Sequence, residues 1–278
     1  MKKYILIFLM MCVCWCDPYP GLILITDSVM SDDPNSPNFT QLIDENGNLI
    51  KRWDHDYYAT MRSHVSSDSI LYAGTKVFAS DITPNKNGRF RKINWEGSVI
   101  WDYVLPQDIC IPHHSFTVLP NGNILTICSE FRSIEELVNN GMIIDNLENI
   151  DNFSFRGNLD MLVEIEPIGS NDANIVWEWR FWDRIIQEVD VNKPNYSVVS
   201  ENPYKIDINC PSTCKESAPL GQDVADWMHC NSVYYNSELD QIVISSRNRC
   251  EFYVIDHSTT TVEAQGSSGG RYNKGGDF

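Results

Sequence analysis

Positive charge is scarce in this sequence. Its 278 residues contain 21 Lys and Arg against 38 Asp and Glu, which gives a formal net charge of −17. A nucleic acid would meet such a chain with long-range repulsion at every phosphate. We therefore exclude nucleic acid as a partner.

Long apolar segments are almost absent. One run, residues 4–15, follows Lys2 and Lys3 and ends before the polar, proline-rich segment 17–20. It is shorter than the roughly 20 apolar residues of a membrane-spanning helix. A basic start and a short apolar core are typical of a secretory signal peptide. We expect residues 1–16 to be that signal and the protein to be exported, to a periplasm, a cell surface or the medium. A lipoprotein signal ending at Cys16 is the alternative, and it would leave a lipid anchor there.

Several familiar chemical motifs are also missing. The sequence has no G-x-S-x-G, no phosphate-binding loop and no G-x-G-x-x-G, which removes the commonest hydrolase and nucleotide-binding signatures. It has no H-E-x-x-H and no paired C-x-x-C, and a zinc site needs three or four ligands. We expect neither a metal site nor a cofactor.

Cysteines are present, and export allows them to pair. Three of the nine lie in the expected signal, and six lie in the body of the chain. Cys210 and Cys214 close a small loop between flanks rich in Gly, Pro and Ser, so we predict a bridge between them. The alternative is that the body cysteines are free, buried thiols acting as small apolar residues.

Helix is scarce, and most of the body is predicted to form short strands. Residues 43–53, 93–103 and 162–179 share one layout, an apolar start, a turn and an apolar strand that ends in an aromatic residue. Recurrence of this layout favours propeller blades of four antiparallel strands. A β-sandwich, which also has many short strands, is the alternative.

Two further hairpins and one helix are expected. Residues 116–127 carry Asn-Gly at a hairpin tip, and residues 232–245 form another hairpin. A capping box at Ser133 and Glu136 predicts a short helix ended by Gly141. Residues 182–226 show little periodicity and are predicted to be a long connection.

Adjacent histidines precede the first of these hairpins. Since successive side chains of a strand point to opposite faces, His114 should share a face with Phe116 while His113 points to the other.

The same alternation places His229 with Asn231, and Ser245 with Arg247. In a propeller the entry strand of each blade lines the central channel, where His114, His229, Asn231 and Arg247 would converge. Such a group offers several donors to a tetrahedral oxyanion, and Arg binds sulfate or phosphate in a bidentate manner. Histidine can serve as base, acid or nucleophile. The plain alternative is that Arg247 pairs with an acidic residue and each histidine has a structural role.

At these residues the chain resembles the bacterial-type arylsulfotransferases, the aryl-sulfate sulfotransferases that need no phosphoadenosine cofactor (PAPS). The similarity is specific in segments 226–233, 238–248, 255–261 and 269–277, and it extends to His113-His114 and to 175–179 upstream. It implies a six-bladed β-propeller with its site in the central channel. It also implies ping-pong transfer of a sulfuryl group from a phenolic sulfate ester to a phenol, through a sulfated histidine.

The resemblance also implies roles. The His113-His114 pair matches the first catalytic histidine of the family, with His114 favoured as a donor and His113 in substrate binding. His229 and Asn231 match an H-x-N element, and Arg247 an S-x-R-N element. Arg247 and Asn231 would hold the sulfuryl oxygens, and His229 would carry the phenol proton as acid and base.

Two departures from the family pattern stand out. Ser115 replaces the aspartate that usually follows the histidine pair, and no residue matches the nucleophilic histidine, which follows the Gly-Gly-Asp motif in the family. At roughly 40–50 residues per blade, residues 17–278 hold about four to five blades. We therefore expect an all-β, arylsulfotransferase-like propeller truncated at its C-terminus, with its nucleophile beyond residue 278 and little activity alone. The alternatives are a non-catalytic propeller that binds a ligand or partner, and a secreted hydrolase of sulfate or phosphate esters.

Overall fold

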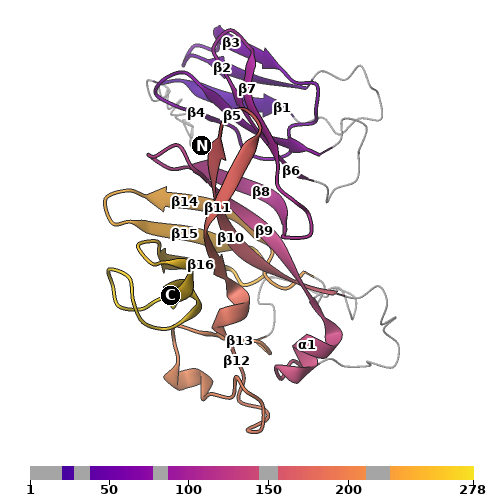
Figure 1. The fold of residues 1–278 in the computed structure, drawn as a ribbon, viewed down its shortest axis with the longest axis vertical. Coiled ribbons are helices and arrows are strands. Elements are labelled where there is room, and N and C mark those ends of the chain that lie inside the picture. Colours follow the sequence, from indigo (N-terminus) through magenta and orange to yellow (C-terminus); the bar gives the residue numbers. More distant parts are fainter. Residues whose placement is uncertain (1–20, 28–37, 78–86, 144–155, 211–225) are drawn as a thin grey trace, which may run out of the picture.

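The computed structural model describes residues 21–27, 38–77, 87–143, 156–210 and 226–278 (Figure 1). The expected signal peptide, residues 1–16, lies outside these ranges, and so does Cys214. Among the described residues no helix is long and apolar enough to cross a membrane.

The fold is mostly β, as the sequence predicted, and is built of small antiparallel sheets in which strands follow in chain order. The first sheet holds β1 (Ile23–Asp27), β2 (Phe39–Ile43) and β3 (Leu49–Asp54). The second holds β4 (His64–Val65), β5 (Leu71–Lys76), β6 (Asn87–Ile93) and β7 (Val99–Val104). The third holds β8 (Ile111–Val118), β9 (Ile124–Ser133), β10 (Arg156–Ile168) and β11 (Asp172–Arg180). The fourth holds β14 (Cys230–Asn236), β15 (Gln241–Ser246) and β16 (Glu251–Asp256).

Other elements are short. The predicted capping box of Ser133 and Glu136 opens α1 (Ile134–Asn139), and Gly141 follows with φ +85°. The connection after β11 contains two 3-10 turns and a parallel pair, and α3 follows β16; their bounds are η2 (Phe181–Arg184), β12 (Ile185–Ile186), η3 (Val199–Glu201), β13 (Ile206–Asp207) and α3 (Thr261–Gln265).

The three similar sequence segments form the last hairpin of the first three sheets. Gly47, Gly97 and Gly169 occupy the turns with positive φ, a conformation that glycine adopts without steric cost. Each hairpin also has a register shift in its first strand, on the side of the turn, at 42/43, at 92/93 and at 164/165. The repeat seen in the sequence is therefore a repeat of structure.

Each repeated segment has, near its end, a tryptophan that links it to a later part of the chain. In each of the three sheets, a buried Trp on the last strand donates its indole N–H to a backbone carbonyl in a later part of the chain. The bonds run from Trp53 to Asn94 (3.0 Å), from Trp101 to Asp172 (2.9 Å) and from Trp179 to Gly276 (2.8 Å). Each of the first two bonds joins one sheet to the last hairpin of the next.

We predict that Trp101→Phe lowers the free energy of unfolding by about 1–3 kcal/mol, because it removes this hydrogen bond and leaves a small void in the core. Denaturant unfolding measures the change. Trp95→Phe is the matched control, since Trp95 is 37% exposed and should lose less than about 0.5 kcal/mol. Equal losses in the two variants would contradict a structural role for the indole bond.

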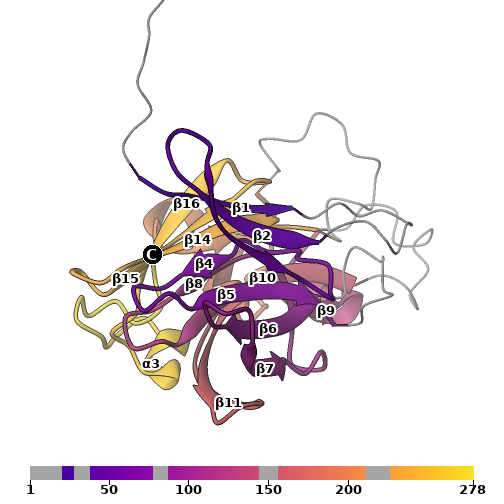
Figure 2. The same cartoon turned by 90° about the horizontal axis from the view of Figure 1, so that it is seen from above.

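Hydrophobic clusters fill the spaces between successive sheets. Four residues, Leu42, Trp53, Leu71 and Ile93, join the first sheet to the second. A larger cluster around Phe90 and Phe116 joins the second to the third, and a third around Trp179 and Ile244 joins the third to the fourth. As a result, β8 lies beside β14 (Figure 2).

One disulfide, between Cys110 and Cys128, links the segment before β8 to β9. The sequence did not single out this pair. Cys250 is disulfide-bonded as well, and Cys230 is a buried thiol. Cys210 is also a thiol, so the predicted bridge between Cys210 and Cys214 is wrong: closeness along the chain does not decide which cysteines pair.

Candidate functional site

The histidine pair lies in a bulge of β8. Pro112 pairs with Cys128 and Phe116 with Thr126, so four steps along β8 match only two along β9. His114 itself has φ +56°, which is uncommon for a residue with a side chain. The predicted alternation is therefore wrong here. The bulge re-aims both rings, and Nδ1 of His113 lies 2.8 Å from Nδ1 of His114.

Behind His113 stands a buried carboxylate on β10. The Asp160 side chain is 1% exposed, and its Oδ1 lies 3.0 Å from Nε2 of His113. Its Oδ2 accepts the backbone N–H of Cys230 at 2.6 Å. Asp160 thus ties β10, β8 and β14 together beneath the histidine pair.

His229 approaches the pair from the segment before β14. It also has a positive φ, +48°, and its ring centroid lies 4.9 Å from that of His114. Nδ1 of His229 contacts Oδ2 of Asp226 at 2.5 Å. The structure therefore places two Asp–His pairs in contact with the ring of His114.

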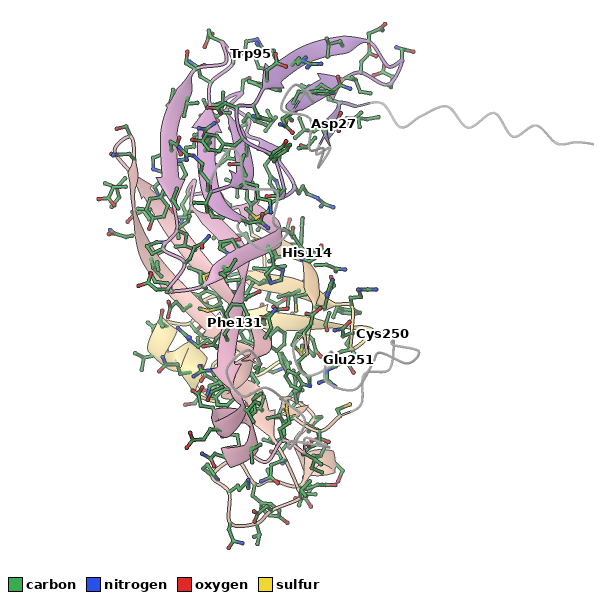
Figure 3. All side chains as sticks on the ribbon, turned by 90° about the vertical axis from the view of Figure 1, so that its right-hand side faces the viewer. Asp27, Trp95, His114, Phe131, Cys250 and Glu251 are labelled. Carbon is green, nitrogen blue, oxygen red and sulfur yellow. A yellow bond between two sulfur atoms is a disulfide. The ribbon has the colours of Figure 1, made fainter. Side chains whose placement is uncertain are left out.

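A pocket of about 320 Å³ opens onto these rings. It is lined by Ile111, His113, His114, Ser129, Phe131, Asn158, Asp226 and His229. Figure 3 labels His114 and Phe131, which come from β8 and β9. The pocket therefore combines imidazoles and a carboxylate with apolar side chains.

Burial and neighbouring rings favour the neutral form of His114. Partial burial lowers the pKa of His114, the nearby His113 and His229 lower it further, and Asp160 and Asp226 oppose this only in part. A neutral imidazole has an unprotonated nitrogen, which can accept a proton or a hydrogen bond.

Asn231 and Arg247 are placed differently from the histidines. Neither lines the pocket. Asn231 sits at a register shift in β14, where its Oδ1 accepts the Ser245 hydroxyl at 2.9 Å. Arg247 lies in the turn after β15, so the predicted alternation with Ser245 does not reach it, and its amide donates to the carbonyl of His229 at 3.1 Å.

The expected convergence thus holds for the histidines and not for these two side chains. The Arg247 side chain is exposed, and it makes no hydrogen bond or ion pair with any other described residue. The plain alternative, a carboxylate partner for Arg247, is not seen within the described ranges.

Sequence reasoning missed both carboxylates of the site. Asp226 opens the segment that contains His229, three residues before it. Asp160 stands in the middle of an apolar strand, and a charged residue in such a strand is rarely buried without a partner. The place of Asp226 near His229, and the charge of Asp160 within an apolar strand, were the sequence features that could have identified the two carboxylates. Within the part of the chain that the structure describes, no group of three or more His, Cys, Asp or Glu could hold a metal ion.

Comparisons with known proteins give one family. The family model described as Arylsulfotransferase (ASST) matches residues 19–274. No curated protein matches the chain. A solved structure of a protein of unknown function from Bacteroides caccae is similar at 7% identity with a TM-score of 0.35. That similarity covers 87% of this chain, which spans 60% of the solved one.

Proposed function

The chain belongs to the arylsulfotransferase (ASST) family, and from this premise we propose that it moves a sulfuryl group from a phenolic sulfate ester to an acceptor phenol. The observation that carries the proposal is the meeting of His113, His114 and His229 at one pocket, with Asp160 and Asp226 behind them.

The pocket suits an aryl sulfate. Ile111 and Phe131 provide apolar surface against which an aromatic ring can pack. The imidazoles provide polar groups for the sulfuryl end, where negative charge shifts during transfer. A site with only one of these two surfaces would bind either a phenol or a sulfate, but would not orient the ester between them.

In the proposed ping-pong reaction, a histidine nitrogen attacks sulfur, the bond from sulfur to the phenolic oxygen breaks, and His229 gives its proton to the departing phenolate. In the second half, the acceptor oxygen attacks sulfur, the N–S bond breaks, and the acceptor gives up its proton, which ends on His229 when the cycle is complete. Asp226 orients the ring of His229 through its contact with Nδ1, which leaves Nε2 for the phenolic oxygen. This is the acid–base role of His229.

Arg247 and Asn231 are proposed to hold the sulfuryl oxygens. Support for Arg247 is its exposed guanidinium, which has no carboxylate partner among the described residues, and its backbone bond to His229. A long, flexible side chain can turn toward an anion once the substrate is present.

We further propose that residues 17–278 form part of a six-bladed propeller and that the protein is exported. The four meandering sheets, joined through buried tryptophans, support the first point. The disulfide between Cys110 and Cys128 supports the second, because such bonds persist in oxidising compartments.

The test is product analysis with 4-nitrophenyl sulfate as donor, with and without added phenol. We expect phenyl sulfate to form only with phenol present, at a low rate because no residue of this chain matches the family's nucleophilic histidine, and nitrophenol release to depend on the acceptor. Release of inorganic sulfate at the same rate without phenol would instead indicate a hydrolase. Binding of the donor without any product would indicate the non-catalytic alternative.

A further inference from the structure

Among the described residues, two hydrogen-bond to Asp160, namely Cys230 and His113, and together they define where one proton lies. Its Oδ2 is occupied by the N–H of Cys230, and its Oδ1 faces Nε2 of His113 at 3.0 Å. An ionised carboxylate only accepts hydrogen bonds, so the proton of His113 is on Nε2.

The position of that proton fixes the next one. A neutral imidazole has one donor nitrogen and one acceptor nitrogen. In the neutral form of His113, with Nε2 donating, Nδ1 must accept, so the proton in the 2.8 Å contact between the two Nδ1 atoms belongs to His114. Nε2 of His114 then carries no proton, and it has no hydrogen-bond partner among the described residues.

We propose that Asp160 is a positioning residue that, acting through His113, holds His114 with an unprotonated Nε2 available to the pocket. The catalytic meaning of this arrangement rests on the proposed function, whereas the proton positions are a property of the chain alone. The resemblance to the family implied that His114 donates a hydrogen bond to the substrate. The hydrogen bonds through His113 instead make Nε2 of His114 an acceptor.

In the second half of the reaction, Nε2 of His114 takes the proton of the acceptor phenol while the new S–O bond forms and the N–S bond breaks. His114 is then a cation 4.9 Å from the ring of His229, measured between centroids. His229 gave up its own proton in the first half. Transfer of the proton from His114 to His229 therefore returns both rings to their starting protonation states. Atoms and charges balance over the full cycle.

The surroundings of His114 suit this role. The titratable groups that face it are His113 on β8, Asp160 on β10, and Asp226 and His229 before β14. Burial and the neighbouring histidines favour its neutral form, which has the lone pair that a base needs.

The substitution Asp160→Asn should exchange the donor and acceptor roles of the ring nitrogens in His113 and His114. The N–H of Cys230 can only donate, so the oxygen of the introduced carboxamide faces it and the nitrogen of that carboxamide faces His113. His113 must then accept at Nε2 and donate from Nδ1. His114 must accept at Nδ1 and carry its own proton on Nε2, where it can no longer act as a base.

Nitrogen-15 NMR of the labelled full chain tests this without any substrate. Long-range spectra at about pH 8, above the ordinary imidazole pKa of about 6.5, separate protonated from unprotonated ring nitrogens, and His114→Gln identifies the signals of His114. We expect an unprotonated Nε2 in the natural protein and a protonated Nε2 in Asp160→Asn. Sulfuryl transfer by Asp160→Asn should fall about 100-fold or more.

Asp226→Asn is the matched control, because Asp226 contacts His229 and not the histidine pair. It should leave the ring nitrogens of His114 unchanged. A protonated Nε2 in the natural protein would overturn the proposal, and that measurement stands even if Asp160→Asn fails to fold. An unprotonated Nε2 in a chain that transfers no sulfate would leave the inference intact and reject the proposed function.

Discussion

Replacing His229 by alanine is expected to slow sulfuryl transfer by about 100- to 10,000-fold, the usual contribution of a positioned acid–base group. His229 is the ring that Asp226 holds at the pocket, opposite His114. Without it the departing phenolate has no proton donor, so the loss should be smaller for donors whose phenol is a strong acid. Rates with 4-nitrophenyl sulfate and with phenyl sulfate measure this difference.

The control is a histidine outside the site. His64 lies in β4, and its Nε2 donates to the carbonyl of Phe116 at 2.7 Å. Glutamine can make the same bond, so His64→Gln should keep its rate within about twofold, since it removes no acid–base group. Equal losses in the two variants would indicate damage to the fold, and full activity in His229→Ala would reject the proposed role.

Replacing His257 by alanine is expected to lower the free energy of unfolding by about 3–5 kcal/mol, as is typical when one partner of a buried ion pair is removed. His257 follows β16 and lies between Glu164 of β10 and Asp240 of the β14–β15 turn, at 2.7 and 2.8 Å. The Glu164 side chain is 5% exposed. Without His257 the buried carboxylate of Glu164 loses its charged partner and keeps hydrogen bonds from the amides of Asn123 and Asn121.

The pH dependence of this pair has a defined sign. Burial alone would lower the pKa of His257, but the hydrogen bonds that its ring donates to Glu164 and Asp240 outweigh burial and raise it. Burial would raise the pKa of Glu164, and its bonds to His257 and Asn123 lower it instead. The pKa of Asp240 is lowered in the same way.

The stabilisation is therefore complete between the ordinary pKa values of 4.5 for Glu164 and 6.5 for His257. It declines as pH rises through the raised pKa of His257, and as pH falls through the lowered pKa values of the carboxylates. Denaturant unfolding of the natural chain and His257→Ala at several pH values measures the difference. A difference that grew steadily above pH 7 would contradict the assignment.

The double variant Glu164→Gln with His257→Gln is the control. It removes both charges and keeps groups able to hydrogen-bond, so it should recover much of the stability lost in His257→Ala. A double variant less stable than His257→Ala would show that shape, rather than the unpaired charge of Glu164, accounts for the loss.

The sequence by itself determined the strands, their turns and the family. Gly47 and Gly97 mark turns because only glycine adopts their backbone conformation freely, and the capping box at Ser133 marks a helix start. These are local properties, so they can be read from neighbouring residues. The family match rests on such segments too, and it covers residues 19–274.

Only the tertiary structure decided how the site is built. Alternation along a strand predicted that His113 and His114 point apart, whereas a bulge of β8 against β9 brings their nitrogens within 2.8 Å. Asp160 is 47 residues from His113 along the chain, and no local pattern announces a contact over that distance. A bulge and a long-range hydrogen bond depend on how one strand pairs with another. The sequence could therefore identify the histidines, but not the carboxylate that determines which of their ring nitrogens carry protons.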